Sequence, residues 1–393
     1  MSTQIDLLDG DFYAGRPYAT YGWMRANAPL YWDPVNELWG VSRYDDVVEI
    51  ERRKDVFISS DQDKGGYRPN IPADPAIIGL DDPLHHERRG LVSRRFTPRA
   101  VAAWDPVVRA KVTALLDAVE ARGGRAEVVA DLAAPLPAMM VGRLLGFPEE
   151  RWHDLQQWSE RTIALGGGPR YFDQEGVAAA MEFAEAALGL YTARKSCPMD
   201  DVMSVWASAD VGGKALGVDD VIADCLLVLD GGAETTRTVI ARTLLALVEH
   251  RDQWEALKAG ADLTVATEEF IRFVTPIHNM CRVATEDYEI AGGTVPKGHQ
   301  VVLMYSSANR DERHFVDPER FDVRRQPNNH ISFGFGTHFC LGAALARLEI
   351  RVFVEELIRR VDALRLTPGT APVEMPNAFV YGLRSAELDL EFS

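Results

Sequence analysis

The sequence has few cysteines, and their spacing excludes several common kinds of site. Its four cysteines are scattered along 393 residues without a Cys-x-x-Cys pair. This spacing argues against a structural zinc site and against a disulfide framework. Isolated free thiols are typical of a reducing cytoplasm, so we expect a cytoplasmic protein.

Nucleotide-binding motifs are also missing. The chain contains neither Gly-x-Gly-x-x-Gly nor a glycine-rich loop ending in Gly-Lys-[Ser/Thr]. It therefore lacks both the dinucleotide fingerprint and the phosphate loop. The chain thus carries no flavin or nicotinamide fingerprint of its own.

Positive charge and long apolar runs are scarce as well. The 59 acidic side chains outnumber the 42 basic ones, and the net charge of −17 argues against nucleic acid as a partner. The segment Met1 to Asp6 is neither basic nor apolar, and we expect no membrane anchor and no stretch long enough to span a membrane. The length fits several average domains or one large enzyme domain equally well.

A glycine-rich stretch near the C-terminus, Phe333 to Gly342, has the sequence Phe-Gly-Phe-Gly-Thr-His-Phe-Cys-Leu-Gly and precedes an amphipathic segment over residues 343–361. Gly334 and Gly336 allow positive φ, so that backbone N–H groups can turn inward, and the following helix adds the positive end of its dipole. Both effects favour a thiolate at Cys340, as the ligand of a haem iron requires. Taken alone, the stretch is equally compatible with a buried structural cysteine.

A long helical pattern covers residues 219–250 and is apolar on most sides. It is interrupted by Asp230-Gly231-Gly232-Ala233-Glu234-Thr235-Thr236. Each mid-helix glycine costs about 1 kcal/mol relative to alanine, so a ligand that approaches the backbone would explain the interruption. Thr235 can also bond back to the carbonyl of Gly231. The alternative is a polar patch where the helix reaches the surface.

Periodicity and turn residues predict the other elements. The expected helices cover residues 18–27, 105–123, 131–145, 149–163 and 174–194; a hairpin covers 30–41, and strands cover 288–290 and 301–304. Gly166 to Pro169 is either a lid joint or an exposed linker. His85 and Arg89, four residues apart, share one helix face and could clamp a pair of carboxylates, although a solvated basic helix is the simpler interpretation.

These stretches together resemble the cytochrome P450 family. The cysteine loop matches Phe-Gly-x-Gly-x-x-x-Cys-x-Gly, the helix interruption resembles Gly-Gly-x-[Asp/Glu]-Thr-Thr, and Glu269 and Arg272 form Glu-x-x-Arg. The resemblance implies a mainly α fold with a smaller β region, a triangular prism with haem b between the long helix and the cysteine loop. It also implies one domain over residues 1–393, with β-rich parts at roughly 28–60, 283–304 and 365–393.

The resemblance assigns roles residue by residue. Cys340 would be the axial ligand of the iron, and Glu234 and Thr235 would deliver protons. Further contacts to haem would come from His85, Arg89, Arg282, His338, Gly232, Phe333 and Gly342. The substrate pocket would be lined by Ile77, Ile78, Val228, Ala233, Ile277, Met280, Phe379 and Val380.

The implied reaction is monooxygenation of a hydrophobic substrate with O₂, with electrons from a ferredoxin and its reductase. The segments around Pro83, Ile277 and the cysteine loop are similar to the bacterial branch that oxidises the side-chain terminus of cholesterol and cholest-4-en-3-one. A terpene, fatty-acid or macrolide hydroxylase, or a haem-thiolate sensor, is the alternative. The resemblance also implies a structural triad of Glu269, Arg272 and Arg320, and a ferredoxin-docking patch made by Arg88, Arg94, Arg95 and Arg99.

Overall fold

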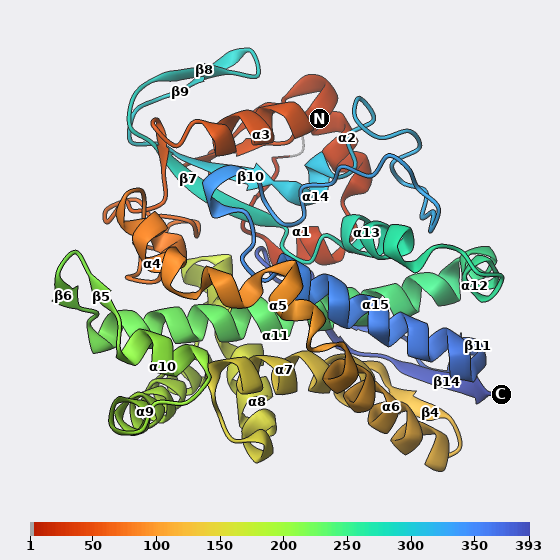
Figure 1. Ribbon diagram of the computed structural model, residues 1–393. Helices are drawn as coiled ribbons and strands as arrows, with labels where there is room; N and C mark the ends of the chain where they lie inside the picture. Colours follow the sequence, from red (N-terminus) through yellow and green to blue (C-terminus); the bar gives the residue numbers. More distant parts are fainter. Residues whose placement is uncertain (1–3) are drawn as a thin grey trace.

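The computed structural model describes residues 4–393 of the chain. Helices dominate it, as the resemblance implied (Figure 1). The α-helices are α1 (Gly10–Ala14), α2 (Tyr18–Asn27), α3 (Tyr44–Arg52), α4 (Leu84–Ser93), α5 (Pro98–Ala102), α6 (Asp105–Ala121), α7 (Pro135–Leu145), α8 (Trp152–Ile163), α9 (Gln174–Ser196), α10 (Val202–Ala207), α11 (Val218–Glu249), α12 (Arg251–Lys258), α13 (Leu263–Val274), α14 (Tyr305–Ala308) and α15 (Ala343–Arg360).

The long helix α11 crosses the middle of the molecule (Figure 1). It contains 32 residues, and its bounds differ from the sequence prediction by one residue at each end. Its apolar side chains are covered on several sides, because it packs against α7, α8, α9, α13 and α15. A helix that is apolar almost all round belongs in the core, and α11 lies there.

Most other helices begin and end near their predicted bounds. The exception is the predicted helix over 131–145, which is divided into a π-helix at Val128–Ala133 and α7. Pro135 and Pro137 have no N–H to donate, so regular helical bonding cannot pass through them. Instead, Ala134 donates its N–H to the carbonyl of Val129, 2.9 Å away, five residues earlier.

The smaller β region consists of two main sheets and three short hairpins. The five-stranded sheet has the order β1-β2-β10-β7-β3, and β1 and β2 form the predicted hairpin. The C-terminal strands pair with β4 in the order β11-β14-β4. The strands are β1 (Leu30–Asp33), β2 (Leu38–Val41), β3 (Phe57–Ile58), β4 (Arg125–Glu127), β5 (Asp210–Val211), β6 (Lys214–Ala215), β7 (Asn279–Ala284), β8 (Tyr288–Ile290), β9 (Gly293–Val295), β10 (Gln300–Met304), β11 (Val361–Leu366), β12 (Val373–Glu374), β13 (Leu383–Ser385) and β14 (Glu387–Phe392).

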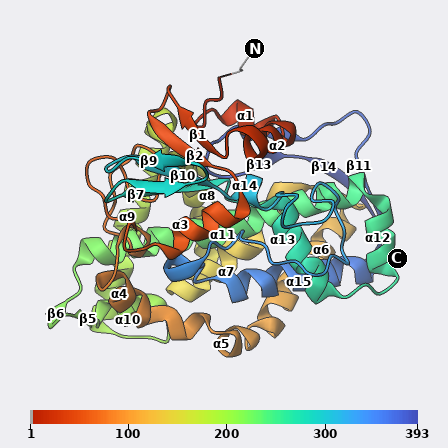
Figure 2. The ribbon, with the colours of Figure 1, turned by 90° about the horizontal axis from the view of Figure 1, so that it is seen from above.

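The five-stranded sheet lies to one side of α11, while α7 and α15 run beside it (Figure 2). One segment, Val128–Leu145, is long and apolar enough to cross a membrane by length and composition alone, contrary to the expectation from sequence. Because 78% of that segment is buried inside the fold, it serves as a core element here.

An unusual acid lies in the core on α15, the helix that follows the cysteine loop. Glu349 on α15 is 2% exposed, and its Oε2 accepts no hydrogen bond from any residue between 4 and 393. Burial raises the pKa of Glu349 to about 8, because the charged form would lose its water without gaining a partner. The folded protein therefore keeps this carboxyl protonated at neutral pH.

This acid makes stability depend on pH. Between the ordinary pKa of a glutamate and pH 8, the folded protein holds a proton that the unfolded chain has lost. The free energy of unfolding should therefore fall as the pH rises through this window, by up to about 1.4 kcal/mol per unit. Glu349→Gln should remove that fall, which chemical denaturation at several pH values would measure. The partly exposed Glu355→Gln is the control, and parallel curves for Glu349→Gln and wild type would contradict the prediction.

Candidate active site

One side of α11 faces open space although the helix lies in the core. Val228, Gly231 and Thr235 all retain accessible surface in the middle of the helix. A Cβ built on Gly231 would have no described atom outside its own helix within 4 Å. The hydroxyl of Thr235 donates to the carbonyl of Gly231 at 2.6 Å, as the sequence suggested. These residues form one wall of an internal site.

Gly232, which the resemblance assigned to the cofactor, faces a neighbouring helix and not the open space. A Cβ on Gly232 would clash with the Val141 side chain of α7. Glycine at this position therefore allows α11 and α7 to pack closely. The next glycine toward the N-terminus, Gly231, is the one that faces the open space.

The cysteine loop forms a second wall. Gly334 and Gly336 have φ values of 69° and 68°, as predicted. The backbone N–H of Cys340 donates to the carbonyl of Phe333 at 2.8 Å, which closes the loop just before α15. A Cβ built on Gly342 would have no described atom outside its chain neighbours within 4 Å, so this wall is also open.

Burial raises the pKa of the Cys340 thiol. The N–H groups of Gly342 and Ala343 and the charges of Arg89 and Arg347 act in the opposite direction, but burial outweighs them. The N–H groups that approach the sulfur thus come from the start of α15. The backbone N–H of Gly334 does not contribute, because it donates to the carbonyl of Ile331. A thiolate at this position requires an additional positive charge, such as that of a coordinated metal ion.

His85 and His338 meet beside the cysteine loop. Their ring centroids are 4.3 Å apart. Burial and the charge of Arg89 lower the pKa of His85, so the approach of Asp82 at 3.5 Å is not an ion pair at neutral pH. Within the described part of the chain, neither ring nitrogen of His85 has a hydrogen-bond partner. Buried unpartnered nitrogens indicate a missing ligand.

Two arginines lie near this histidine pair. Burial, together with the charges of Arg282 and Arg89, lowers the pKa of His338 to about 2. Arg282 is also paired with buried Glu51 at 3.1 Å, a partner that the sequence did not reveal. Two cations and two neutral imidazoles near one thiol suit a ligand with carboxylates and a metal centre. The residues present therefore fit the haem that the resemblance implies.

Glu234 lies on the buried side of α11. Its carboxylate accepts a hydrogen bond from Arg237 at 2.8 Å, and the same arginine approaches the partly exposed Glu160 at 3.5 Å. Burial raises the pKa of Glu234, although Arg237 acts against this shift. The predicted proton donor is therefore joined through one arginine to the surface of α8.

The predicted pocket residues fall into three groups. Val228 and Ala233 lie on α11 and pack with α7 and α9. The second group is one apolar cluster, in which the backbone of Ile277 pairs with that of Val380; it contains Ile277, Met280, Phe379 and Val380. Ile77 donates its N–H to Asp224 at 2.7 Å, and Ile78 follows it in the same short 3₁₀ turn.

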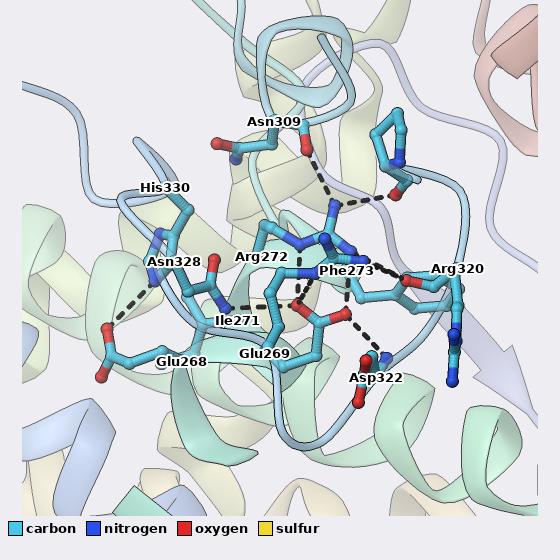
Figure 3. A network of polar contacts seen from close by, with 12 residues as sticks. Glu268, Glu269, Ile271, Arg272, Phe273, Asn309, Arg320, Asp322, Asn328 and His330 are labelled. Carbon is cyan, nitrogen blue, oxygen red and sulfur yellow. Dashed lines mark hydrogen bonds and ion pairs between the residues drawn. The ribbon is translucent and has the colours of Figure 1, made fainter. Parts of the chain in front are cut away.

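A polar network joins α13 to the segment that leads into the cysteine loop (Figure 3). Arg272 donates to both carboxylate oxygens of Glu269, at 2.7 and 2.9 Å. The predicted third member, Arg320, contributes its backbone carbonyl, and its side chain is exposed. Arg325 takes its place, with its Nε 3.0 Å from Glu269. The triad is therefore Glu269, Arg272 and Arg325, because the loop after Arg320 turns back toward α13.

The predicted docking patch also needs correction. Arg88 is 2% exposed and pairs with Asp224 at 2.6 Å and Asp220 at 3.1 Å. A buried, doubly paired arginine cannot contribute to a surface. Arg94 and Arg99 are exposed, whereas Arg95 pairs with Asp200 at 2.7 Å.

A separate surface cleft of about 780 Å³ lies at the C-terminal end of α11. It is bordered by α2, by the end of α13 and by residues 312–319. Arg16 and Glu249 form an exposed ion pair at 3.1 Å on its lining. None of the predicted site residues lines it, so the cleft is distinct from the two walls described above.

Comparison with known proteins identifies the class of the fold and site. Residues 190–390 match the family model "Cytochrome P450". A "Steroid C26-monooxygenase" from Mycobacterium tuberculosis is 41% identical, covering 97% of this chain and 96% of the relative. A "Linalool 8-monooxygenase" from Pseudomonas putida is 32% identical, covering 92% and 93%. The crystal structure of CYP109E1 from Bacillus megaterium in complex with testosterone has a TM-score of 0.88 at 32% identity, covering 96% and 98%.

The chain therefore belongs to the cytochrome P450 family. It is a monooxygenase of that family, which uses a haem whose iron is ligated by a cysteine thiolate. The predicted fold, enzyme class and cofactor are confirmed. The residue assignments and the single-domain organisation stay predictions.

Sequence reasoning missed several polar residues of the site. Glu51 comes from a segment without a motif, Arg237 directly follows the helix interruption, and Arg325 lies five residues after Arg320, which the motif favoured. Asp230 was visible as an acid within the helix interruption, but it received no role. A search for every charged residue within a predicted core helix would have found Asp230 and Arg237.

The corrected triad predicts different effects for two neighbouring arginines. Arg325→Ala removes a cation from a fully buried carboxylate and should lower the free energy of unfolding by about 3 kcal/mol. Arg320→Ala is the matched control and should change it by no more than about 0.5 kcal/mol, since its side chain is exposed. Chemical denaturation of both variants would measure this, and equal losses would restore the original assignment.

Proposed function

We propose that the chain hydroxylates the terminal side-chain carbon of a steroid such as cholest-4-en-3-one. The observation that carries the proposal is 41% identity, over nearly the whole length of both chains, to a protein named Steroid C26-monooxygenase. The testosterone complex of CYP109E1 adds support from a similar fold. Electrons would come from a ferredoxin and its reductase, in keeping with the absence of nucleotide motifs.

Cys340 would hold the haem iron, and His85, Arg89, Arg282 and His338 would contact the carboxylates of the cofactor. Two observations support these roles. The ring nitrogens of His85 lack a partner in the described chain, and His85, His338 and both arginines lie close to the thiol. When bound, haem with a thiolate ligand supplies the chemistry that activates O₂. Phe333 would cover the loop, since its ring packs under the guanidinium of Arg347 at 4.5 Å.

Glu234 and Thr235 would control protons at the open face of α11. The Thr235 hydroxyl lies beside Gly231, where no Cβ crowds the space. In its present bond it gives its proton to a backbone carbonyl, so it can accept a hydrogen bond from a water molecule. Glu234 can hold a proton near neutral pH because burial raises its pKa.

The apolar cluster around Ile277 and Phe379 would cover the hydrocarbon of the substrate. Gly166 lies against the ring of Phe379, where a Cβ would clash. The joint at Gly166 to Pro169 thus contacts the pocket and would serve as its lid. We interpret residues 1–393 as one domain, and the free thiols fit a cytoplasmic enzyme.

A terpene hydroxylase is the second candidate. It is favoured by the relative named Linalool 8-monooxygenase, at 32% identity. A haem-thiolate sensor is disfavoured, because it would need neither Glu234 nor Thr235.

Ligand titration tests the proposed function. Cholest-4-en-3-one should shift the haem spectrum toward high spin, and the oxidised product should carry its new oxygen on the terminal side-chain carbon. Reduced protein with carbon monoxide should show the red-shifted band of a thiolate ligand, and Cys340→Ala should abolish it. A panel in which only terpenes or fatty acids bind would reject the steroid while leaving the family unaffected.

Loss of the Thr235 hydroxyl should uncouple reductant consumption from product formation. Thr235→Ala removes the group that would order water at the open face of α11, so proton transfer would no longer follow one defined path. We expect several-fold more hydrogen peroxide for each product molecule, with reductant consumption largely retained. Thr235→Ser keeps the hydroxyl and should restore coupling. Unchanged coupling in Thr235→Ala would show that protons arrive by another route.

A further inference from the structure

Asp230 is an acid on the accessible side of α11, one residue before Gly231. The residue is only partly buried although the helix lies in the core. The apolar side chains of Leu229 and Val228 precede it. An acid in such surroundings is costly unless a partner offsets its burial.

The contacts of Asp230 indicate the protonation state of its carboxyl group. The Thr162 hydroxyl of α8 lies 2.7 Å from Oδ1 of Asp230 and 2.8 Å from the carbonyl of Trp158. A hydroxyl donates only one proton, and a carbonyl can only accept. If Thr162 donates to Trp158, as helical threonines commonly do, Asp230 must be the donor to Thr162. Burial raises the pKa of Asp230 well above its ordinary value, in agreement with a neutral acid.

Two further polar groups surround this acid. Ser159, one turn before Thr162, is fully buried, and it lies close enough to Asp230 to act against the rise of its pKa, although its hydroxyl has no hydrogen bond of good geometry within the described chain. Arg68, from the loop before α4, is paired with Asp74 at 2.7 Å, and its charge acts on Asp230. The Nε of Arg68 is likewise buried without a partner among residues 4–393. Three chain segments therefore bring polar groups together beside Asp230, among them a buried Nε of Arg68 without a partner in the described chain.

We propose that Asp230, with Ser159 and Arg68, forms a polar subsite that hydrogen-bonds one oxygen, a hydroxyl or a carbonyl, on the hydrophobic substrate. A neutral carboxyl can both donate and accept, so either kind of oxygen satisfies it. This inference rests on the proposed function only in assuming that substrate binds along α11. Asp230 is thus a specificity-determining residue of the pocket.

The helix sets the position of that oxygen. Asp230 precedes Thr235 by five residues, which is about 7.5 Å along the helix axis and about 140° around it. The recognised oxygen therefore lies close to the reacting carbon. On a steroid whose side-chain terminus is oxidised, a side-chain hydroxyl meets this spacing, whereas an oxygen at the far end of the ring system does not.

The test uses ligand pairs that differ by one hydroxyl. The pairs are 22-hydroxycholesterol with cholesterol, and linalool with citronellene, the hydrocarbon that lacks the hydroxyl of linalool. Binding to the holoenzyme is measured by calorimetry and by the spectral shift, for wild type, Asp230→Asn and Asp230→Leu. Asp219→Asn, an exposed acid at the start of α11, is the control.

We expect wild type and Asp219→Asn to prefer a hydroxylated ligand by about tenfold. Asp230→Leu should lose the preference, while Asp230→Asn, of similar size and still able to donate and accept, should keep part of it. An equal preference in wild type and Asp230→Leu overturns the subsite, even if steroids bind. If only the linalool pair binds, with an Asp230-dependent preference, the subsite stands and the steroid function fails.

Discussion

The buried guanidinium of Arg272 is the interaction on which the cysteine loop depends. Its side chain is fully buried, so its charge must be compensated within the protein. Glu269 supplies both carboxylate oxygens, and the carbonyls of Asn309, Pro318 and Arg320 accept the remaining N–H groups. One side chain of α13 thus fixes the path of the chain before Cys340. Arg325 also pairs with Glu269, so the chain from Asn309 to Arg325 is held to α13 at both of its ends.

Helix α11 carries the opposite kind of constraint, because it holds polar groups where a core helix would be apolar. A local partner offsets the cost of burying each of these groups: the carbonyl of Gly231 for Thr235, Arg237 for Glu234, and Thr162 for Asp230. Two glycines further weaken the helix, yet they perform different tasks. Gly232 permits contact with α7, while Gly231 leaves open space. The packing of α7 and α8 therefore stabilises a helix that local propensity alone would not favour.

Much of this arrangement could be predicted from sequence. The bounds of α11, the positive φ of Gly334 and Gly336 and the bond from Thr235 to Gly231 all depend on local pattern, and the structure has them. The errors arose where tertiary contacts decide. The choice between Arg320 and Arg325 depends on the course of a loop, and the buried position of Arg88 depends on two acids more than a hundred residues away. Gly231 and Gly232 differ by one helical position, which is about 100° around the axis, enough to exchange open space for a neighbouring helix.

The placement of Asp230 and Thr235 on one helix has a consequence for selectivity. Side chains on a rigid helix keep a fixed separation, whereas loops around a pocket adjust to different ligands. Arg68 belongs to such a loop, and Ser159 and Thr162 lie near the end of α8, just before the glycine joint. The spacing along α11, by contrast, is set by the helix itself. The side chains of α8 and of the loop would therefore regulate how firmly an oxygen is held, while α11 determines which carbon lies near Thr235.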